Sequence, residues 1–365
     1  MWPYWFLLLI PLILAALAGT RMGVKHSQYL NPPVLGLDSV GLGLYGLLMI
    51  LVIGWRHQVG ADWMHYLRPL EAALDQNLME GMMAGGDPAY GLLTWLSAQV
   101  GGGIYLVNLV CALIFVGGLL IFANHSHQPW LALAVAVPYL VIVVAMGYTR
   151  QGVAIGLVMV GLVALDKGRL FVFGKWLVLA ALFHKSALIL MPLAVFAGRQ
   201  KWGALLGVLV VGVLLFALLL AEHVDTLIAG YITDQYASSG AGVRVAMNAL
   251  PAAIFLILRK RFRLSPAQQS FWTWMSLGAL AFIGLLAVSP SSTAVDRIAL
   301  YWIPLQLFVW SRLPQAMGQQ AGTQRQWLLV VLAYAVAVQF VWLFYADHSW
   351  AWVPYQFYPW VWLWQ

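Results

Sequence analysis

The chain has 365 residues, of which 63% are hydrophobic and only 8% are charged, whereas a soluble domain carries about 25% charged residues. This composition excludes a soluble fold and predicts that the chain uses the lipid bilayer as its solvent. The formal charge of +7 does not indicate a nucleic-acid partner, because Lys and Arg lie in short loops and form no basic stripe.

Apolar runs long enough, or nearly long enough, to cross a hydrocarbon layer of about 30 Å recur along the chain. They occupy residues 2–20, 38–55, 104–123, 131–147, 149–165, 203–221, 244–258, 271–288, 298–312 and 327–345. The first run lacks a basic n-region and a cleavage site, so we expect a retained helix and not a signal peptide. Residues 170–198 hold two shorter apolar stretches, which form either two short helices or a re-entrant hairpin. The sequence predicts one all-α domain over residues 1–365, a polytopic membrane bundle of about ten to twelve transmembrane helices.

The orientation of the bundle follows from its basic residues, which cytoplasmic loops collect. With the N-terminus outside, 13 of the 19 Lys and Arg residues lie inside. The six that remain outside are Arg56, Arg68, Arg150, Lys185, Arg244 and Arg297. We therefore expect an N-out, C-out topology, in which residues 56–103 form the first extracytoplasmic loop, with short helices. Residues 346–365 form an aromatic-rich extracytoplasmic tail, which either anchors the chain at the membrane interface or stacks on sugars.

Polar residues at outer helix ends are the candidates for chemistry, and the first group opens the loop 56–103. Arg56 ends a helix on the side opposite to the positive-inside bias. Asp62 and Tyr66 are i, i+4 neighbours and share one face of a helical turn. Either Arg56 pairs with Asp62 and fixes the loop, or the three residues hold an anionic or sugar ligand.

The second and third groups lie farther along the chain. Arg150-Gln151 opens a helix. A guanidinium beside the free N–H groups of a helix start suits a phosphate ligand. The alternative is that Arg150 only extends toward the lipid headgroups. His184-Lys185 interrupts an apolar stretch. His184 is therefore either a proton acceptor or diphosphate ligand, or a histidine that is hydrogen-bonded inside the bundle.

The last group is Asp296-Arg297, which together with Tyr301 lies at the start of a helix. Arg297 and Tyr301 share a face of that helix, which favours a ligand-binding role. The alternative is that Asp296 and Arg297 pair with each other and only cap the helix. Arg244 opens its own helix from the outside in the same way. The four outer arginines at helix ends thus predict one convergent site for an anion.

These segments, taken in order, resemble the EpsG family of bacterial exopolysaccharide polymerases, relatives of the Wzy O-antigen polymerases. The resemblance spans about residues 50–355. It rests on Arg56-x-x-Val59-Gly60-Ala61-Asp62-Trp63-x-x-Tyr66, Tyr90-Gly91-Leu92-Leu93, Arg150-Gln151, Phe183-His184-Lys185-Ser186-Ala187, Asp296-Arg297-Ile298-Ala299-Leu300-Tyr301 and Pro354-Tyr355. Family members often carry an acidic residue just before the position of Tyr90, whereas Asp87-Pro88-Ala89 stands here, so we assign no role to Asp87.

The resemblance implies a GT-C-like enzyme that joins oligosaccharide repeat units carried on undecaprenyl diphosphate at the periplasmic face of the bacterial inner membrane. It further implies metal-independent, inverting glycosyl transfer without a cofactor. The expected partners are the lipid-linked donor and acceptor, membrane lipids and a chain-length regulator of the polysaccharide pathway. The residue chemistry agrees, because arginines stabilise a leaving diphosphate and either Asp62 or His184 can serve as the base. The expected substrate-binding residues are Arg56, Tyr66, Arg150, Gln151, Lys185, Arg244, Asp296, Arg297 and Tyr301.

Two other functions compete with polymerisation. An O-antigen ligase uses the same donor but typically has one large periplasmic loop, whereas the outer loops after residue 103 are short. A transporter or flippase of lipid-linked sugars places polar groups near the bilayer midplane, whereas the polar groups here cluster on one side. The sequence contains no P-loop, G-x-S-x-G or H-E-x-x-H motif, and its single cysteine, Cys111, lies in an apolar run. Neither ATP hydrolysis nor zinc proteolysis is therefore expected.

Overall fold

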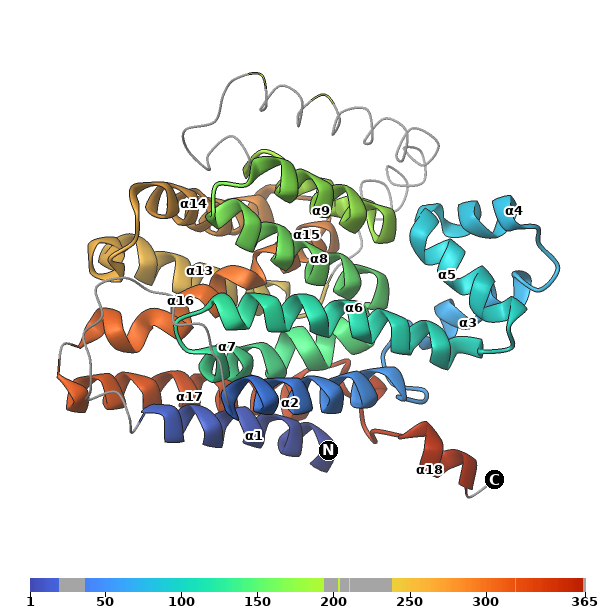
Figure 1. Ribbon diagram of the computed structural model, residues 1–365, viewed down its shortest axis with the longest axis horizontal. Coiled ribbons are helices and arrows are strands. Elements are labelled where there is room, and N and C mark those ends of the chain that lie inside the picture. Colours follow the sequence, from blue (N-terminus) through green and yellow to red (C-terminus); the bar gives the residue numbers. More distant parts are fainter. Residues whose placement is uncertain (20–36, 194–202, 204–209, 211–237, 319, 364–365) are drawn as a thin grey trace.

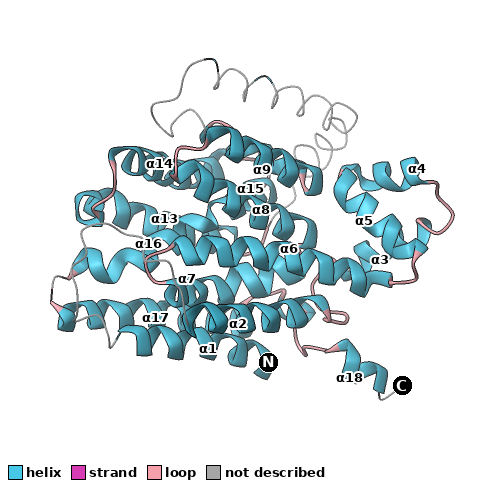
Figure 2. Cartoon of the chain, viewed as in Figure 1, coloured by secondary structure: helices cyan, strands magenta, loops and turns pink. Residues whose placement is uncertain are grey.

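A computed structural model of the chain describes residues 1–19, 37–193, 203, 210, 238–318 and 320–363. Within these residues every element is a helix, and many of the longer helices lie roughly along one direction (Figure 1). Figure 2 shows no strand in this part of the chain. The elements are α1 (Trp2–Gly19), α2 (Leu37–Gly54), α3 (Trp63–Ala72), α4 (Leu78–Met83), η1 (Ala84–Gly86), α5 (Pro88–Gln99), α6 (Gly103–His125), α7 (Pro129–Ala136), η2 (Val137–Ala145), α8 (Thr149–Asp166), α9 (Leu170–Phe183), η3 (Lys185–Leu190), α13 (Ala241–Leu258), η6 (Arg259–Phe262), α14 (Pro266–Val288), α15 (Ser292–Ala299), η7 (Leu300–Trp302), α16 (Ile303–Met317), α17 (Ala321–Tyr345), η8 (Ser349–Ala351) and α18 (Tyr358–Leu363).

The described part of the chain holds six helices long and apolar enough to cross a membrane, namely α1, α6, α8, α13 with η6, α14 and α17. Three shorter apolar helices cover Ser39–Gly54, Pro129–Ala145 and Leu170–Phe183. The prediction of an all-α polytopic membrane protein is thereby confirmed. The predicted run over 203–221 lies outside the described residues, apart from positions 203 and 210, and the total of ten to twelve spans stays a prediction.

Some helices differ from the apolar runs that predicted them. α14 begins at Pro266 and not at 271, because Ser265 and Gln268 form a capping box that starts the helix with a polar turn. The predicted helix over 298–312 is divided into α15, the 3₁₀ turn η7 and α16. In the segment 170–198, α9 is followed by the short 3₁₀ helix η3, and residues 194–198 lie outside the described part.

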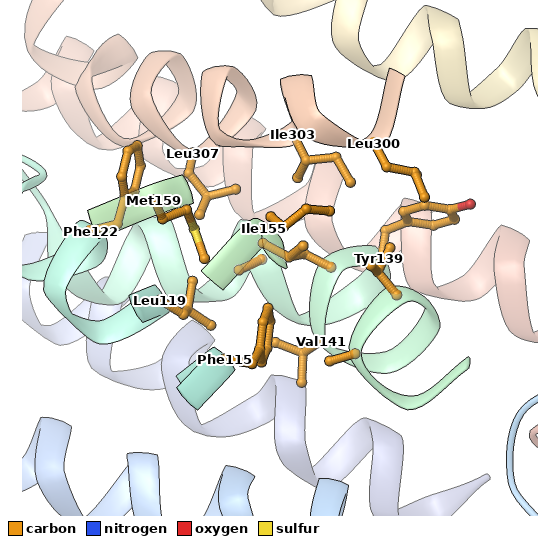
Figure 3. Packing of buried hydrophobic residues seen from close by; sticks show 14 of the residues in the cluster. Phe115, Leu119, Phe122, Tyr139, Val141, Ile155, Met159, Leu300, Ile303 and Leu307 are labelled. Carbon is orange, nitrogen blue, oxygen red and sulfur yellow. The ribbon is translucent and has the colours of Figure 1, made fainter. Parts of the chain in front are cut away.

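The core of the bundle lies between α6, η2, α8 and α16. Nearly all residues of η2 and α16 are buried. Figure 3 shows Phe115 and Leu119 of α6 among Ile155 and Met159 of α8 and Leu307 of α16. The outer helices instead expose apolar side chains, which suits contact with lipid tails and not with water.

A pair of glycines allows α6 and α8 to cross closely. A Cβ atom on Gly118 would collide with the carbonyl oxygen of Gly156, and one on Gly156 would lie 2.7 Å from the Cα atom of Phe115. Small residues at a crossing point let the two backbones approach and pack by van der Waals contact. This contact fixes the start of α8, where Arg150 lies, relative to α6.

One end of the bundle collects the polar residues singled out by the sequence, and we call it the α3–α5 end. The short helices α3, α4 and α5 lie there, as Figure 1 shows. The side chain of Arg56, which follows α2, reaches Thr149 at the start of α8. Arg244 at the start of α13 likewise reaches Asp296 in α15. Helix ends that are distant in sequence therefore meet at the α3–α5 end.

Candidate functional site

A cavity of about 580 Å³ opens at the α3–α5 end, between the start of α13, α15 and the end of α17. Its polar lining consists of Asp62, Tyr139, Tyr148, Ser238, Ser239, Arg244, Thr293, Asp296, Arg297, Tyr334, Tyr345, Asp347 and His348. Four of the residues predicted from the sequence, Asp62, Arg244, Asp296 and Arg297, thus share one cavity. Tyr148, Asp347 and His348 also line it and were not predicted.

The backbone before Asp62 is fixed by a glycine that no other residue can replace without strain. Gly60 has φ +103°, and a Cβ atom there would lie 2.7 Å from the carbonyl oxygen of Met146. The Gly60 amide also donates a hydrogen bond of 2.8 Å to the carbonyl of Ala351 in the tail. Because both contacts are made by backbone atoms, Asp62 is held at the cavity wall by the fold and not by its own side chain.

The carboxylate of Asp62 has no partner among the described residues. Asp62 occupies the N-cap position of α3, yet its side chain accepts no capping hydrogen bond. The predicted pair with Arg56 is not formed, because the Arg56 guanidinium donates to Ile53 O, Asn108 Oδ1 and Thr149 Oγ1 instead. An unpaired carboxylate in a cavity is available to accept a proton from a bound hydroxyl group.

Arg244 and Asp296 form an ion pair inside the cavity. Arg244 Nε donates to Asp296 Oδ1 at 2.5 Å and Nη2 donates to Oδ2 at 2.8 Å, while Ser238 Oγ donates to Oδ2 at 3.1 Å. This two-point contact neutralises much of the charge on Arg244. The alternative Asp296–Arg297 pair is not formed, so Asp296 holds the arginine of a different helix.

Arg297 is a cation in the cavity with no carboxylate within 4 Å among the described residues. Its guanidinium lies 3.8 Å above the ring of Tyr148, in a cation–π contact. Burial raises the pKa of Tyr148, so this ring stays neutral beneath the cation. Gln151 Nε2 donates a hydrogen bond of 2.6 Å to the backbone carbonyl of Arg297 and thereby fixes its position. The guanidinium of Arg297 is thus available in the cavity to bind an anion.

A second cluster surrounds Asp87, which was not among the predicted site residues. Asp87 is 3% exposed, and its Oδ2 atom accepts from Arg150 Nη1 at 2.8 Å. His184 Nδ1 lies 3.6 Å from the same oxygen, and the backbone amide of Lys185 donates to Oδ1 at 3.3 Å. Asp87 therefore joins the motifs at Arg150 and at His184, which lie on different helices.

A smaller cavity of about 160 Å³ lies beside this cluster, between α3, α4 and α5. Its polar lining is His65, Tyr66, Tyr90, Thr94 and Arg150. Burial, followed by the nearby Asp62 carboxylate, raises the pKa of Tyr66, so its phenol stays protonated and can donate a hydrogen bond. Tyr66 lines this small cavity, and Asp62, four residues earlier in the chain, lines the large one.

Five predicted residues line neither cavity, namely Arg56, Gln151, His184, Lys185 and Tyr301. Arg56 is 1% exposed and ties the end of α2 to α6 and α8 through Asn108 and Thr149. Tyr301 is buried, and its hydroxyl forms a hydrogen bond of 3.0 Å with Ser186 Oγ. The backbone amide of Lys185 donates to Asp87 Oδ1, so this residue helps to hold the carboxylate.

The C-terminal tail packs onto the α3–α5 end, a contact that aromatic composition did not predict. Trp352 is fully buried and donates to the carbonyl of Ile142 at 2.8 Å, and Tyr355 donates to Val52 O at 2.8 Å. Trp360 and Trp362 are exposed at 67% and 66%. The tail thus combines a buried anchor for the site with an exposed aromatic end.

The chemistry available at this end is proton acceptance and anion binding. Among the described residues, no group of three or more His, Cys, Asp or Glu side chains is placed to hold a metal ion. Asp62 supplies a basic oxygen and Arg297 a guanidinium in the same cavity. A reaction that moves a proton from a hydroxyl group and creates an anionic leaving group uses both.

A bundle of apolar helices with these groups gathered at one end defines a polytopic membrane protein with a candidate active site. The chain belongs to the EpsG family, whose model matches residues 42–357 of the 365. This range encloses both cavities, and the predicted resemblance is confirmed. Membership of the family points to an exopolysaccharide polymerase. Among curated proteins and among solved structures, nothing matches the chain.

Proposed function

We propose that the chain is a polysaccharide polymerase that joins oligosaccharide repeat units carried on undecaprenyl diphosphate. The observation that carries this proposal is the presence, in one cavity, of an unpaired carboxylate, Asp62, and of a cation without a carboxylate partner, Arg297, among the described residues. A glycosyl transfer from a lipid diphosphate needs one group of each kind. Membership of the EpsG family supports the same activity.

In the proposed reaction, Asp62 accepts the proton of an acceptor hydroxyl group as its oxygen attacks the anomeric carbon of the donor sugar. The new glycosidic bond forms while the bond between that carbon and the diphosphate oxygen breaks, so the configuration is inverted. The electron pair leaves with the lipid diphosphate, whose negative charge Arg297 stabilises. Fixed guanidinium groups can do this without a metal ion, and we propose a reaction that needs neither metal nor cofactor.

The other polar residues have supporting roles in this proposal. Arg244 adds hydrogen-bond donors beside the diphosphate, and Asp296 sets its orientation. The small cavity near Tyr66 and Arg150 receives the acceptor sugar, since neutral phenols and a guanidinium suit sugar hydroxyl groups. His184, 3.6 Å from Asp87, positions this cluster.

We propose that the α3–α5 end faces the periplasm of a bacterial inner membrane, which the 13 to 6 distribution of basic residues supports. A chain-length regulator of the same polysaccharide pathway is then a candidate partner. The ligase and flippase alternatives remain distinguishable by their products.

The decisive experiment places the purified chain in vesicles with undecaprenyl-diphosphate-linked repeat units and follows the size of the glycan. We expect a ladder of polymers that EDTA does not diminish. In cells that lack the gene, single repeat units on lipid should accumulate. Accumulation of finished polymer on lipid would instead indicate a ligase, and repeat units confined to the cytoplasmic leaflet would indicate a flippase.

A further inference from the structure

The large cavity continues away from its polar residues as a groove between α13 and α17. On α17 it is lined by one stripe, Tyr334, Ala337, Val338, Val341, Trp342 and Tyr345. Positions spaced by three or four residues lie on one face of a helix, so this stripe forms a continuous wall. Val243 and Met247 of α13 form the facing wall. Tyr139 of η2 also lines the cavity, and α16 packs against both α13 and α17.

The groove runs from the polar end of the bundle to about the middle of α17. Eleven residues separate Tyr345 from Tyr334, which corresponds to about 16 Å along a helix. This is about half of a hydrocarbon layer of about 30 Å. The inner end is closed by hydrogen bonds from Tyr334 to Gln306 Oε1 at 3.3 Å and from Gln306 to Asn248 Oδ1 at 2.7 Å.

The walls of the groove are accessible from the side. Val341 is 48% exposed and Val243 59% exposed, so the two helices leave an opening between them. An occupant that enters from the side needs an apolar chain for the groove and an anionic group for Arg297 at its outer end. A prenyl lipid with a diphosphate headgroup has this distribution of charge, whereas a free sugar phosphate has no part for the groove.

We propose that this groove binds the polyisoprenyl tail of the donor, so that the donor enters sideways from the bilayer between α13 and α17 and its diphosphate stops at Arg297. The inference rests on the proposed function for the identity of the donor. Beyond the proposed function, the inference states where the polyisoprenyl tail binds and how far it extends along α17. Ala337 and Val338 then determine which lipid lengths the groove accepts.

Two neighbouring substitutions on α17 test the groove. Ala337→Trp fills it, whereas Val336→Trp is the matched control, because Val336 is 37% exposed on the same helix and does not line the cavity. Each variant is assayed in vesicles with a donor that carries the full polyprenyl tail and with one that carries two isoprene units. Thermal unfolding of each variant and of the unchanged chain shows whether the folded protein is preserved.

We expect Ala337→Trp to raise KM for the long-tailed donor about tenfold or more, since each buried methylene that loses its contact weakens binding about fourfold. KM for the short-tailed donor should stay unchanged, and Val336→Trp should alter neither. An equal effect of Ala337→Trp on both donors, or no effect on either, would overturn the placement of the tail.

A photo-cross-linking measurement separates this inference from the proposed function. A polyprenyl diphosphate with a diazirine in its second isoprene unit should label peptides of α13 and α17, and unlabelled polyprenyl diphosphate should suppress the labelling. This measurement requires no turnover, so it can succeed even if polymerisation fails. Labelling that is confined to other helices, or that bilayer phospholipid alone suppresses, would refute the inference.

Discussion

Substitution of Asp62 by asparagine tests the assignment of the general base. The amide keeps the shape of the side chain and removes its basic oxygen. Loss of a general base typically lowers the rate about 10²- to 10⁴-fold. The carboxylate makes no capping hydrogen bond and no ion pair among the described residues, so the free energy of unfolding should change by only about 0.5 kcal/mol. Activity and stability should therefore separate.

The assay compares initial rates of polymer formation in vesicles with the thermal unfolding temperature and with binding of the lipid-linked donor. Asp75→Asn is the matched control, because Asp75 is exposed between α3 and α4 and lines neither cavity. Near-normal polymerisation by Asp62→Asn would refute the assignment. If His184→Ala then abolished the polymer without loss of folded protein, the base would be His184.

Four other predictions follow from the ion pairs, the buried contacts and the charge distribution. Arg150→Lys should lose most polymerisation although the charge is kept, because a single ammonium cannot reproduce the guanidinium fork; near-normal polymer from this variant would contradict a role in the site. Asp87→Asn should lower the free energy of unfolding by about 1–3 kcal/mol, measured by thermal unfolding, because the amide keeps only one acceptor oxygen and either Arg150 or the Lys185 amide loses its acceptor. Arg56→Lys should also reduce stability in that measurement, because one ammonium on a flexible stem cannot reach the three acceptors of the guanidinium, and unchanged stability would show that these contacts are dispensable. Reporter fusions after Gly86 should read external and fusions after Arg263 cytoplasmic, and reversed signals would place the cavity on the other side of the membrane.

The membrane class of the fold could be predicted from hydropathy, whereas the ends of the helices could not. The apolar runs gave the centres of α6 and α8 because lipid requires apolar side chains there. Hydropathy did not predict the first turn of α14, because the side chains that form a capping box are polar. The π-helical geometry of η2 was also missed, since its residues are as apolar as those of an α-helix.

The site shows a different limit of sequence reasoning. Asp87 precedes Pro88 at the start of α5, which is the pattern of an ordinary helix start. Its side chain does not cap that helix and instead reaches Arg150, 63 positions away in the sequence. Local spacing contains no signal for such a contact, so only the packing of α5 near the start of α8 reveals it.

The motifs predicted which segments lie near one another, but not the separate contacts that the residues within one motif make. In the first, Arg56 is buried at 1% exposure and binds Thr149, while Asp62 faces the cavity. In the second, Gln151 is buried at 2% exposure and holds the backbone of Arg297 from another motif. The hydrogen bonds of Arg56 and Gln151 offset part of the free-energy cost of burying these polar side chains. The second and the last motif therefore depend on one another, because Gln151 of the second positions Arg297 of the last.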